Sequence, residues 1–182
     1  MKKVFSVMAA LVIALSINAA ERGKFIHVDA TVNKNLKPQI AFVQESKEVT
    51  TLLVKTVNTN AYNEFTDASR VLVRFADGTA VRLNCRPGKE PQKNKFSKKN
   101  GNSTISYYET ITEYEVLPEV IEKLEAGVAI IKVRVVFKEN DAKDYDIAEG
   151  YQPKMAADLL KSYQDAVLNF KKSNSDLSDE DF

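Results

Sequence analysis

The sequence predicts an α+β fold: a mainly antiparallel sheet of about six to seven strands, one short helix, and a C-terminal amphipathic helix packed on one face of the sheet. Two observations support this prediction. Strand-like segments follow one another from residue 24 to residue 116 with no helical segment between them. Helical spacing of apolar residues appears only later, in residues 117–127 and 152–173, on either side of one more strand. A parallel α/β fold would instead alternate strands and helices along the whole chain.

The first strands are predicted from side-chain alternation and β-branched residues. Residues 24–32, KFIHVDATV, alternate apolar and polar side chains, which is typical of a half-buried strand. Residues 39–43 and 48–57 are rich in apolar and β-branched side chains, which favour strands. Residues 58–69 have neither pattern, and we expect a loop there.

A β-hairpin is predicted for residues 70–85, because an Asp-Gly pair lies between two strand-like segments. A three-residue turn at 76–78 places Val73 opposite Val81 and keeps all apolar side chains on one face. A two-residue turn would shift one strand by a residue and expose its apolar set. We therefore expect the longer turn, with its glycine in the left-handed region. Cys85 then lies on the apolar face.

The C-terminal part of the chain predicts strand, helix, strand and helix. Residues 104–116 are rich in Tyr and Thr and indicate a long strand. Residues 117–127 indicate a short helix that begins at a proline and ends at a glycine. An apolar strand is expected at 128–137. Residues 152–173 carry apolar side chains at helical spacing, which predicts the amphipathic C-terminal helix.

The order of these segments resembles a group of small exported α+β proteins of Gram-negative gut anaerobes, a group without an established function. The resemblance covers about residues 70–170 and rests on VRFADGTAVRL, then a Tyr/Thr-rich strand, then LPEVIEKLEAGVAIIKVRV and LLKSYQDAV. It implies an exported α+β domain. It supplies no catalytic or binding residues, because none are established for the group.

A signal peptide is predicted at residues 1–20. Lys2 and Lys3 precede an apolar stretch that is too short for a comfortable membrane span, and cleavage fits near Ala20. We therefore expect a soluble protein that is exported to the periplasm or the cell exterior, with no transmembrane segment in the mature chain. Residues 21–172 are expected to form a single α+β domain. Residues 173–182, with four acidic side chains, are expected to be a disordered acidic tail.

The residue composition argues against several kinds of catalytic site. The single histidine, His27, rules out a multi-histidine metal site, and no metal or cofactor motif is present. The single cysteine, Cys85, cannot form an internal disulfide. A Cys85–His27 catalytic pair is disfavoured because one side chain is expected on an apolar face and the other on a polar face. The acidic segment 139–150 lacks the spacing of a calcium loop and is interpreted as a solvated loop. No catalytic residue is assigned.

Residues 84–103 have the most pronounced local charge in the chain. Six cations and a single acid lie between residues 86 and 99, in what we expect to be a long connection between two strands. Long connections are either functional or disordered, so both a solvated loop and an anion-contacting loop remain open. Only one aromatic residue, Phe96, interrupts the lysines, so binding of nucleic acid is not expected. The candidate anion-binding residues are Arg86, Lys89, Lys93, Lys95, Lys98 and Lys99.

Three functions are compatible with the sequence. The first is a non-enzymatic binding or interaction module of the cell envelope, whose partner would be a protein, a glycan or a lipid head group. The second is a carboxylate-based hydrolase that uses Glu109, Glu113 and Glu115, three acids on one face of the Tyr/Thr-rich strand. The third is an inhibitor or structural subunit that docks by a loop or a sheet edge. The missing catalytic motifs favour the first. The sequence does not indicate an oligomeric state.

Overall fold

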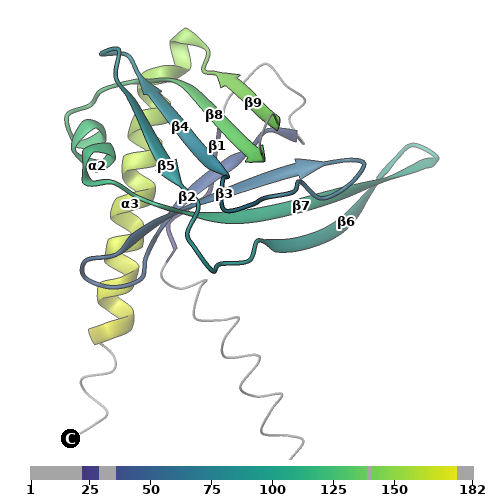
Figure 1. Cartoon of the computed structure of the whole chain (residues 1–182), viewed down its shortest axis with the longest axis horizontal. Helices are drawn as coiled ribbons and strands as arrows, with labels where there is room; N and C mark the ends of the chain where they lie inside the picture. Colours follow the sequence, from purple (N-terminus) through teal and green to yellow (C-terminus); the bar gives the residue numbers. More distant parts are fainter. Residues whose placement is uncertain (1–21, 29–35, 139–140, 176–182) are drawn as a thin grey trace, which may run out of the picture.

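The computed structural model describes residues 22–28, 36–138 and 141–175. These residues form two antiparallel sheets, a short helix and a long C-terminal helix, which confirms the α+β class (Figure 1). The elements are β1 (Ile26–His27), β2 (Gln39–Gln44), β3 (Thr50–Asn58), β4 (Arg70–Phe75), β5 (Ala80–Asn84), β6 (Gln92–Asn100), β7 (Ser103–Glu115), α2 (Pro118–Glu125), β8 (Ile130–Lys138), β9 (Asp141–Asp146), the 3-10 helix η2 (Glu149–Tyr151) and α3 (Gln152–Ser175).

Some predicted segments lie outside the described residues. These are the signal peptide at 1–20, residues 29–32 of the first predicted strand, and residues 176–182 of the acidic tail. The helix α3 continues to Ser175, so it includes the first three residues of the segment for which we expected disorder. Neither α3 nor any other helix in the described ranges is long and apolar enough to cross a membrane.

The strands are divided between two sheets rather than gathered in one. The larger sheet has the order β1-β2-β3-β7-β6, and the smaller has the order β5-β4-β8-β9. The predicted β4–β5 hairpin has the expected register, because Val73 lies opposite Val81 and Gly78 has a φ of 87°. An isolated bridge between Cys85 and Tyr114 joins the end of β5 to β7 in the other sheet.

One hydrophobic core connects the two sheets and both helices. Its largest fully buried side chains include Phe42 and Tyr114 from the larger sheet and Phe75 and Phe137 from the smaller one. Val120 and Leu124 of α2 and Met155 and Leu159 of α3 complete it. The inner faces of the sheets and the apolar stripes of the helices are therefore buried against one another, as the alternating sequence predicts.

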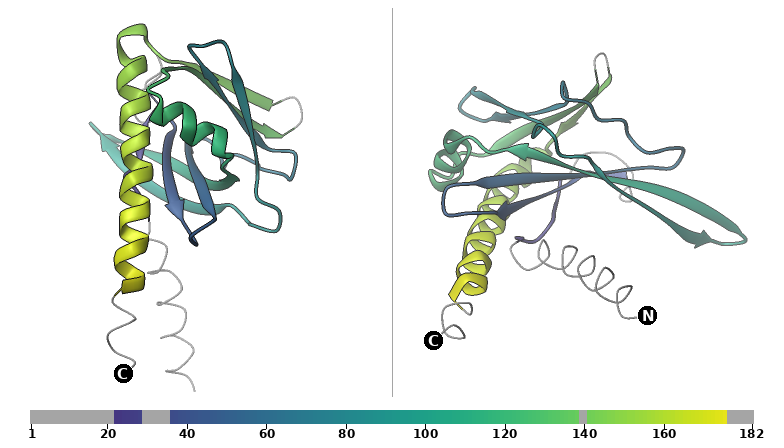
Figure 2. Two further views of the ribbon diagram at one scale, coloured as in Figure 1. Left: turned by 90° about the vertical axis from the view of Figure 1, so that its left-hand side faces the viewer. Right: turned by 60° about the horizontal axis from the view of Figure 1, so that its bottom comes forward.

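The helix α3 meets the larger sheet through a buried serine as well as through apolar contacts. The Ser162 hydroxyl accepts a hydrogen bond from the Phe42 backbone N–H at 3.3 Å and donates one to the Lys24 carbonyl at 2.9 Å. The Gly23 N–H donates to the Phe42 carbonyl at 2.9 Å. Ser162 therefore satisfies backbone groups where the N-terminal segment departs from regular pairing with β2. Figure 2 shows α3 running alongside the strands.

Two segments that were predicted to be loops are strands. The basic segment contains β6, which pairs with β7 from Gln92 to Asn100. The acidic segment 139–150 contains β9, which pairs with β8. Both are edge strands, and every residue of β6 is exposed. Apolar alternation signals a strand only where one face is buried, so the sequence of β6 does not show the pairing that its backbone makes.

The Tyr114 hydroxyl leads to a stability prediction. It is buried with no hydrogen-bond partner among the described residues, and burial raises the pKa of this phenol. An unpaired buried polar group costs about 1–3 kcal/mol. We therefore expect Tyr114→Phe, which keeps the ring, to raise the free energy of unfolding by about 1 kcal/mol in urea denaturation. Tyr145→Phe is the control, because the Tyr145 hydroxyl is not among the buried unpartnered atoms of the described residues, so its removal should not raise stability. Destabilisation by Tyr114→Phe would show that the hydroxyl is hydrogen-bonded in solution.

Candidate functional site

In the β6–β7 hairpin, the strand β6 is exposed along its whole length. The hairpin is closed by a two-residue turn, Gly101 and Asn102, with Asn100 opposite Ser103. Gly101 has a φ of 61°, the left-handed conformation that tight hairpin turns require. The hairpin extends away from the helices and from the smaller sheet (Figure 1). The strand β6 forms the outer edge of the larger sheet.

The pairing of β6 sorts its lysines onto two faces. Side chains alternate along a strand, so Lys93, Lys95 and Lys99 share one face and Lys98 lies on the other. Lys93 and Lys99 are six residues apart, or about 20 Å along the strand. Tyr62 and Tyr108 lie on the same side as these three lysines. We call Lys93, Lys95, Lys99, Tyr62 and Tyr108 the lysine face.

The two tyrosines are packed beside the lysines. Lys93 Nζ lies 5.8 Å from the ring centre of Tyr62, and Lys95 Nζ lies 5.1 Å from that of Tyr108. The two rings meet edge to face, with their centres 5.1 Å apart. Ammonium groups over aromatic rings are held by cation–π attraction. The lysine face therefore combines three lysines with two half-buried tyrosine rings.

The lysines of the lysine face are not held in ion pairs by the described carboxylates. Among the described residues, no ion pair involves Lys93, Lys95 or Lys99. Glu64 lies on the neighbouring loop but forms its ion pair with Lys138. The hydrogen bond and charge of Lys138 lower the pKa of Glu64, and the charge of Lys93 adds to this effect. The ammonium groups of Lys93, Lys95 and Lys99 therefore form no ion pair within the described structure.

Arg86 and Lys89, two of the six predicted anion-binding residues, pair with carboxylates of this chain instead. Arg86 is bonded to Glu45 and to the Thr51 hydroxyl, and it lies 3.5 Å from a carboxylate oxygen of Glu113. Lys89 lies 3.8 Å from the same Glu113 oxygen. Burial alone would raise the pKa of Glu45, but hydrogen bonds from Arg86 and Thr51 lower it overall. These cations neutralise half-buried acids at the base of the hairpin.

Lys98 belongs to a separate aromatic group on the opposite face. Phe96 and Tyr107 stack with an interplanar angle of 14° and ring centres 5.3 Å apart. Lys98 Nζ lies 5.7 Å from the Phe96 ring and 5.8 Å from the Tyr107 ring. The six predicted residues therefore fall into three groups, and only Lys93, Lys95 and Lys99 share one face of β6.

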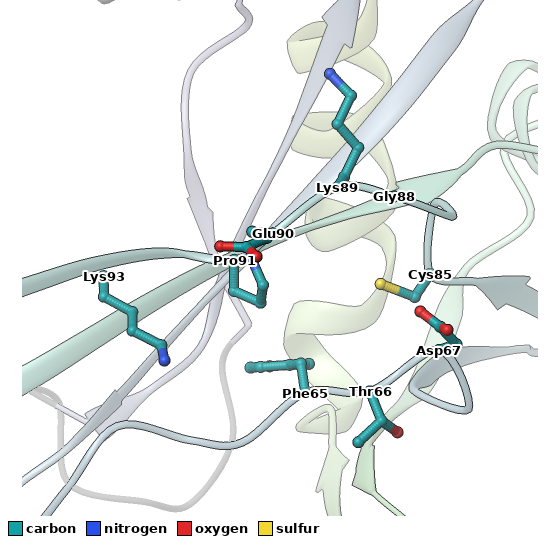
Figure 3. Close-up of a pocket in the computed structure, with 9 residues that line it drawn as sticks. All are labelled: Phe65, Thr66, Asp67, Cys85, Gly88, Lys89, Glu90, Pro91 and Lys93. Atoms are coloured by element: carbon teal, nitrogen blue, oxygen red, sulfur yellow. The ribbon is translucent and has the colours of Figure 1, made fainter.

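A pocket of about 490 Å³ lies at the base of the hairpin, next to Lys93 (Figure 3). Cys85, Phe65 and Asp67 line its other side. Burial, with a contribution from the charge of Asp67, raises the pKa of the Cys85 thiol.

The structure does not bring His27 close to the Cys85 thiol, so the two do not form a catalytic pair. Cys85 bridges to β7, whereas His27 lies on β1, three strands and roughly 14 Å across the sheet.

The three glutamates of the hydrolase hypothesis do not form an isolated carboxylate pair. Glu109 lies 3.4 Å from Lys55 and accepts a hydrogen bond from Asn94 at 3.2 Å. Glu113 is held by the cations described above. Glu109 and Glu113 are four residues apart on one strand, or about 13 Å, beyond the roughly 5–9.5 Å between glycosidase carboxyl groups. Glu115 is nearer to Glu113 but lies exposed at the strand end.

A second basic surface, which was not predicted, lies on the outer face of the smaller sheet. Arg70 and Arg74 flank Leu72 along β4, and Arg82 lies opposite Leu72 on β5. Among the described residues, these three arginines form no ion pair. The alternation of Arg70, Leu72 and Arg74 with an apolar inner set is visible in the sequence and could have identified this face.

The proximity of Tyr62 and Tyr108 on the lysine face could not be predicted from the sequence, because it depends on the packing of a loop against β7.

Comparison with protein-family models, curated proteins and solved structures finds no match to this chain. The resemblance to exported proteins of gut anaerobes therefore stays an expectation.

Proposed function

We propose that the protein is an exported, soluble component of the cell envelope that acts as a non-enzymatic binding module and contacts an anionic partner through its lysine face. The main support is the row formed by Lys93, Lys95 and Lys99 on an exposed strand, with no ion-paired carboxylate among the described residues. The signal-like residues 1–20 support export.

The hairpin presents this charge in a way that favours binding. A row of about 20 Å can meet several charges of an extended anion at once. Because the strand backbone is already ordered by pairing with β7, less conformational entropy is lost on binding than for a mobile loop. The two tyrosines add flat surface against which sugar rings or apolar groups can pack. The partner class is an anionic glycan, lipid head group or protein segment.

Retention on immobilised dextran sulfate tests this proposal. The chain without residues 1–20 is applied at low salt and eluted with a salt gradient. We expect the Lys93→Ser, Lys95→Ser, Lys99→Ser triple variant to elute far earlier than the native chain. If three contacts are lost, the slope of log affinity against log salt concentration should fall by roughly 2–3, since about one counterion is released per contact.

A charge-matched variant provides the control. Arg74→Ser, Arg82→Ser and Lys171→Ser remove the same charge from exposed positions that form no ion pair among the described residues. This variant should be retained almost as well as the native chain. Equal losses in the two variants would show that retention reflects overall charge, and would contradict a site on the lysine face.

A further inference from the structure

The free edge of β6 carries a regular series of backbone groups that do not face β7. A two-residue hairpin turn is closed by a hydrogen-bonded residue pair, here Asn100 and Ser103. Such pairs alternate with non-bonded pairs along an antiparallel ladder. The even-numbered residues of β6 therefore bond to β7, and the odd-numbered residues direct their N–H and C=O groups outward. Even-numbered residues of β6 lie opposite odd-numbered residues of β7, so the backbone groups of odd-numbered β7 residues should face the β6 side of the strand. The carbonyl of Glu113, an odd-numbered residue of β7, accepts a hydrogen bond from the Arg86 N–H at 3.0 Å, which agrees with this alternation.

The outward backbone groups belong to the three lysines of the lysine face and to Ser97, which lies between them. Lys93, Lys95, Ser97 and Lys99 are the odd-numbered residues between 93 and 99. Their side chains share one face, and their amide and carbonyl groups share the free edge. No described strand covers this edge, because β6 is the last strand of its sheet. An incoming strand would thus meet a hydrogen-bonding edge and a row of ammonium groups in the same register.

We propose that the partner is an extended acidic protein segment that adds to the free edge of β6 as a sixth strand. In this arrangement, main-chain hydrogen bonds hold the segment and its carboxylates meet Lys93, Lys95 and Lys99. A strand places every second side chain on one face, so the segment carries acids at alternate positions. This inference rests on the proposed function, because it uses the same lysine face and specifies the class of its ligand.

Charge complementarity selects this occupant over a second copy of the chain. Pairing β6 with another β6 would bring two rows of lysines together, and like charges on adjacent strands are destabilising. Lysines on an edge strand discourage self-association of this kind. An acidic strand would instead place carboxylates opposite these lysines, and opposite charges on adjacent strands attract each other. An anionic glycan could meet the lysines, but it does not provide the regular amide and carbonyl groups of a strand.

A fluorescent nine-residue peptide of alternating Thr and Asp tests the proposal by fluorescence anisotropy. The protein is the chain without residues 1–20, with either Ser97→Pro or Ser97→Ala. Ser97→Pro removes one outward N–H while leaving every backbone hydrogen bond to β7, since proline is tolerated where an edge N–H faces solvent. Ser97→Ala controls for the loss of the hydroxyl, which lies 3.2 Å from that of Ser106. Thermal denaturation confirms that both variants are folded.

We expect the native chain and Ser97→Ala to bind the peptide with affinities within about twofold, and Ser97→Pro to bind at least tenfold more weakly. A peptide N-methylated at its four Asp amides keeps its charge but loses inward donors, and should also bind at least tenfold more weakly to the native chain. This second comparison needs no protein variant, so it is decisive even if Ser97→Pro fails to fold.

Dextran sulfate separates the failure of this inference from the failure of the proposed function. Retention of the native chain by dextran sulfate, with equal binding of the methylated and unmethylated peptides or with no peptide binding, would overturn strand addition and leave an anion-binding lysine face. Loss of both activities would contradict both proposals. Peptide binding that survives in the triple lysine variant would place the peptide elsewhere and would also overturn strand addition at the lysine face.

Discussion

Replacing Gly23 with alanine is expected to lower the free energy of unfolding by about 2–3 kcal/mol, the upper part of the range for an overpacked buried site. A Cβ at this position would lie 1.9 Å from the Ser162 carbonyl oxygen and 2.6 Å from its hydroxyl. The first of these atoms is backbone within α3, so it cannot move without shifting the helix. The segment at 22–25 or the helix must therefore give way.

The loss extends beyond the clash itself. Displacing Gly23 would also disturb the Ser162 hydroxyl, which bonds to backbone groups of Phe42 and Lys24. Thermal denaturation should show a melting temperature lower by about 5–10 °C for a chain of this size. Gly150→Ala is the matched control, because no atom lies within 4 Å of the added Cβ and its φ is not positive. Equal stability of the two variants would contradict the close approach of α3.

Replacing Arg86 with alanine is expected to cost about 2 kcal/mol of stability while leaving the retention on dextran sulfate nearly unchanged. The Arg86 side chain is 21 % exposed, and its partners Glu45 and Glu113 are 30 % and 20 % exposed. Removing the guanidinium leaves two half-buried carboxylates without their main partner. The matched control is Arg134→Ala, whose pair with Asp144 is more exposed, so its loss should cost clearly less stability than that of Arg86.

The effect of Arg86→Ala should depend on pH. Glu45 has its pKa lowered from 4.5 in the folded chain, so the pair stabilises the fold above that value and loses this contribution as the pH falls through the lower pKa. Urea denaturation should therefore show the largest difference between native and variant near neutral pH and a smaller one as the pH falls below 4.5. A large drop in dextran sulfate retention would instead assign Arg86 to the binding site.

The sequence predicted most of the fold wherever a strand or helix buries one face. The register of β4 and β5 followed from keeping Val71 and Val73 on the apolar side, and the structure confirms it. The strands β6 and β9 were missed because they are exposed edge strands, stabilised by backbone pairing rather than by burial. The division into two sheets depends on which strands pair across long separations, and local pattern does not contain that information.

The candidate site was predicted in composition but not in arrangement. The sequence identified a basic cluster, and alternation within β6 then separates Lys98 from Lys93, Lys95 and Lys99. The sequence could not predict that Arg86 pairs with Glu45 instead of joining the lysine face, because Glu45 is 41 residues away in the sequence. The contribution of Tyr62 likewise depends on a loop that packs against β7.

The location of anion binding can be measured directly by amide chemical-shift mapping of the isotope-labelled chain with a dextran sulfate oligomer. The proposed function predicts that the largest shifts occur at Lys93, Lys95 and Lys99 and at the neighbouring Tyr108, with little change at Arg74 and Arg82. Shifts centred on Arg74 and Arg82, or spread evenly over the surface, would contradict a binding site on the lysine face.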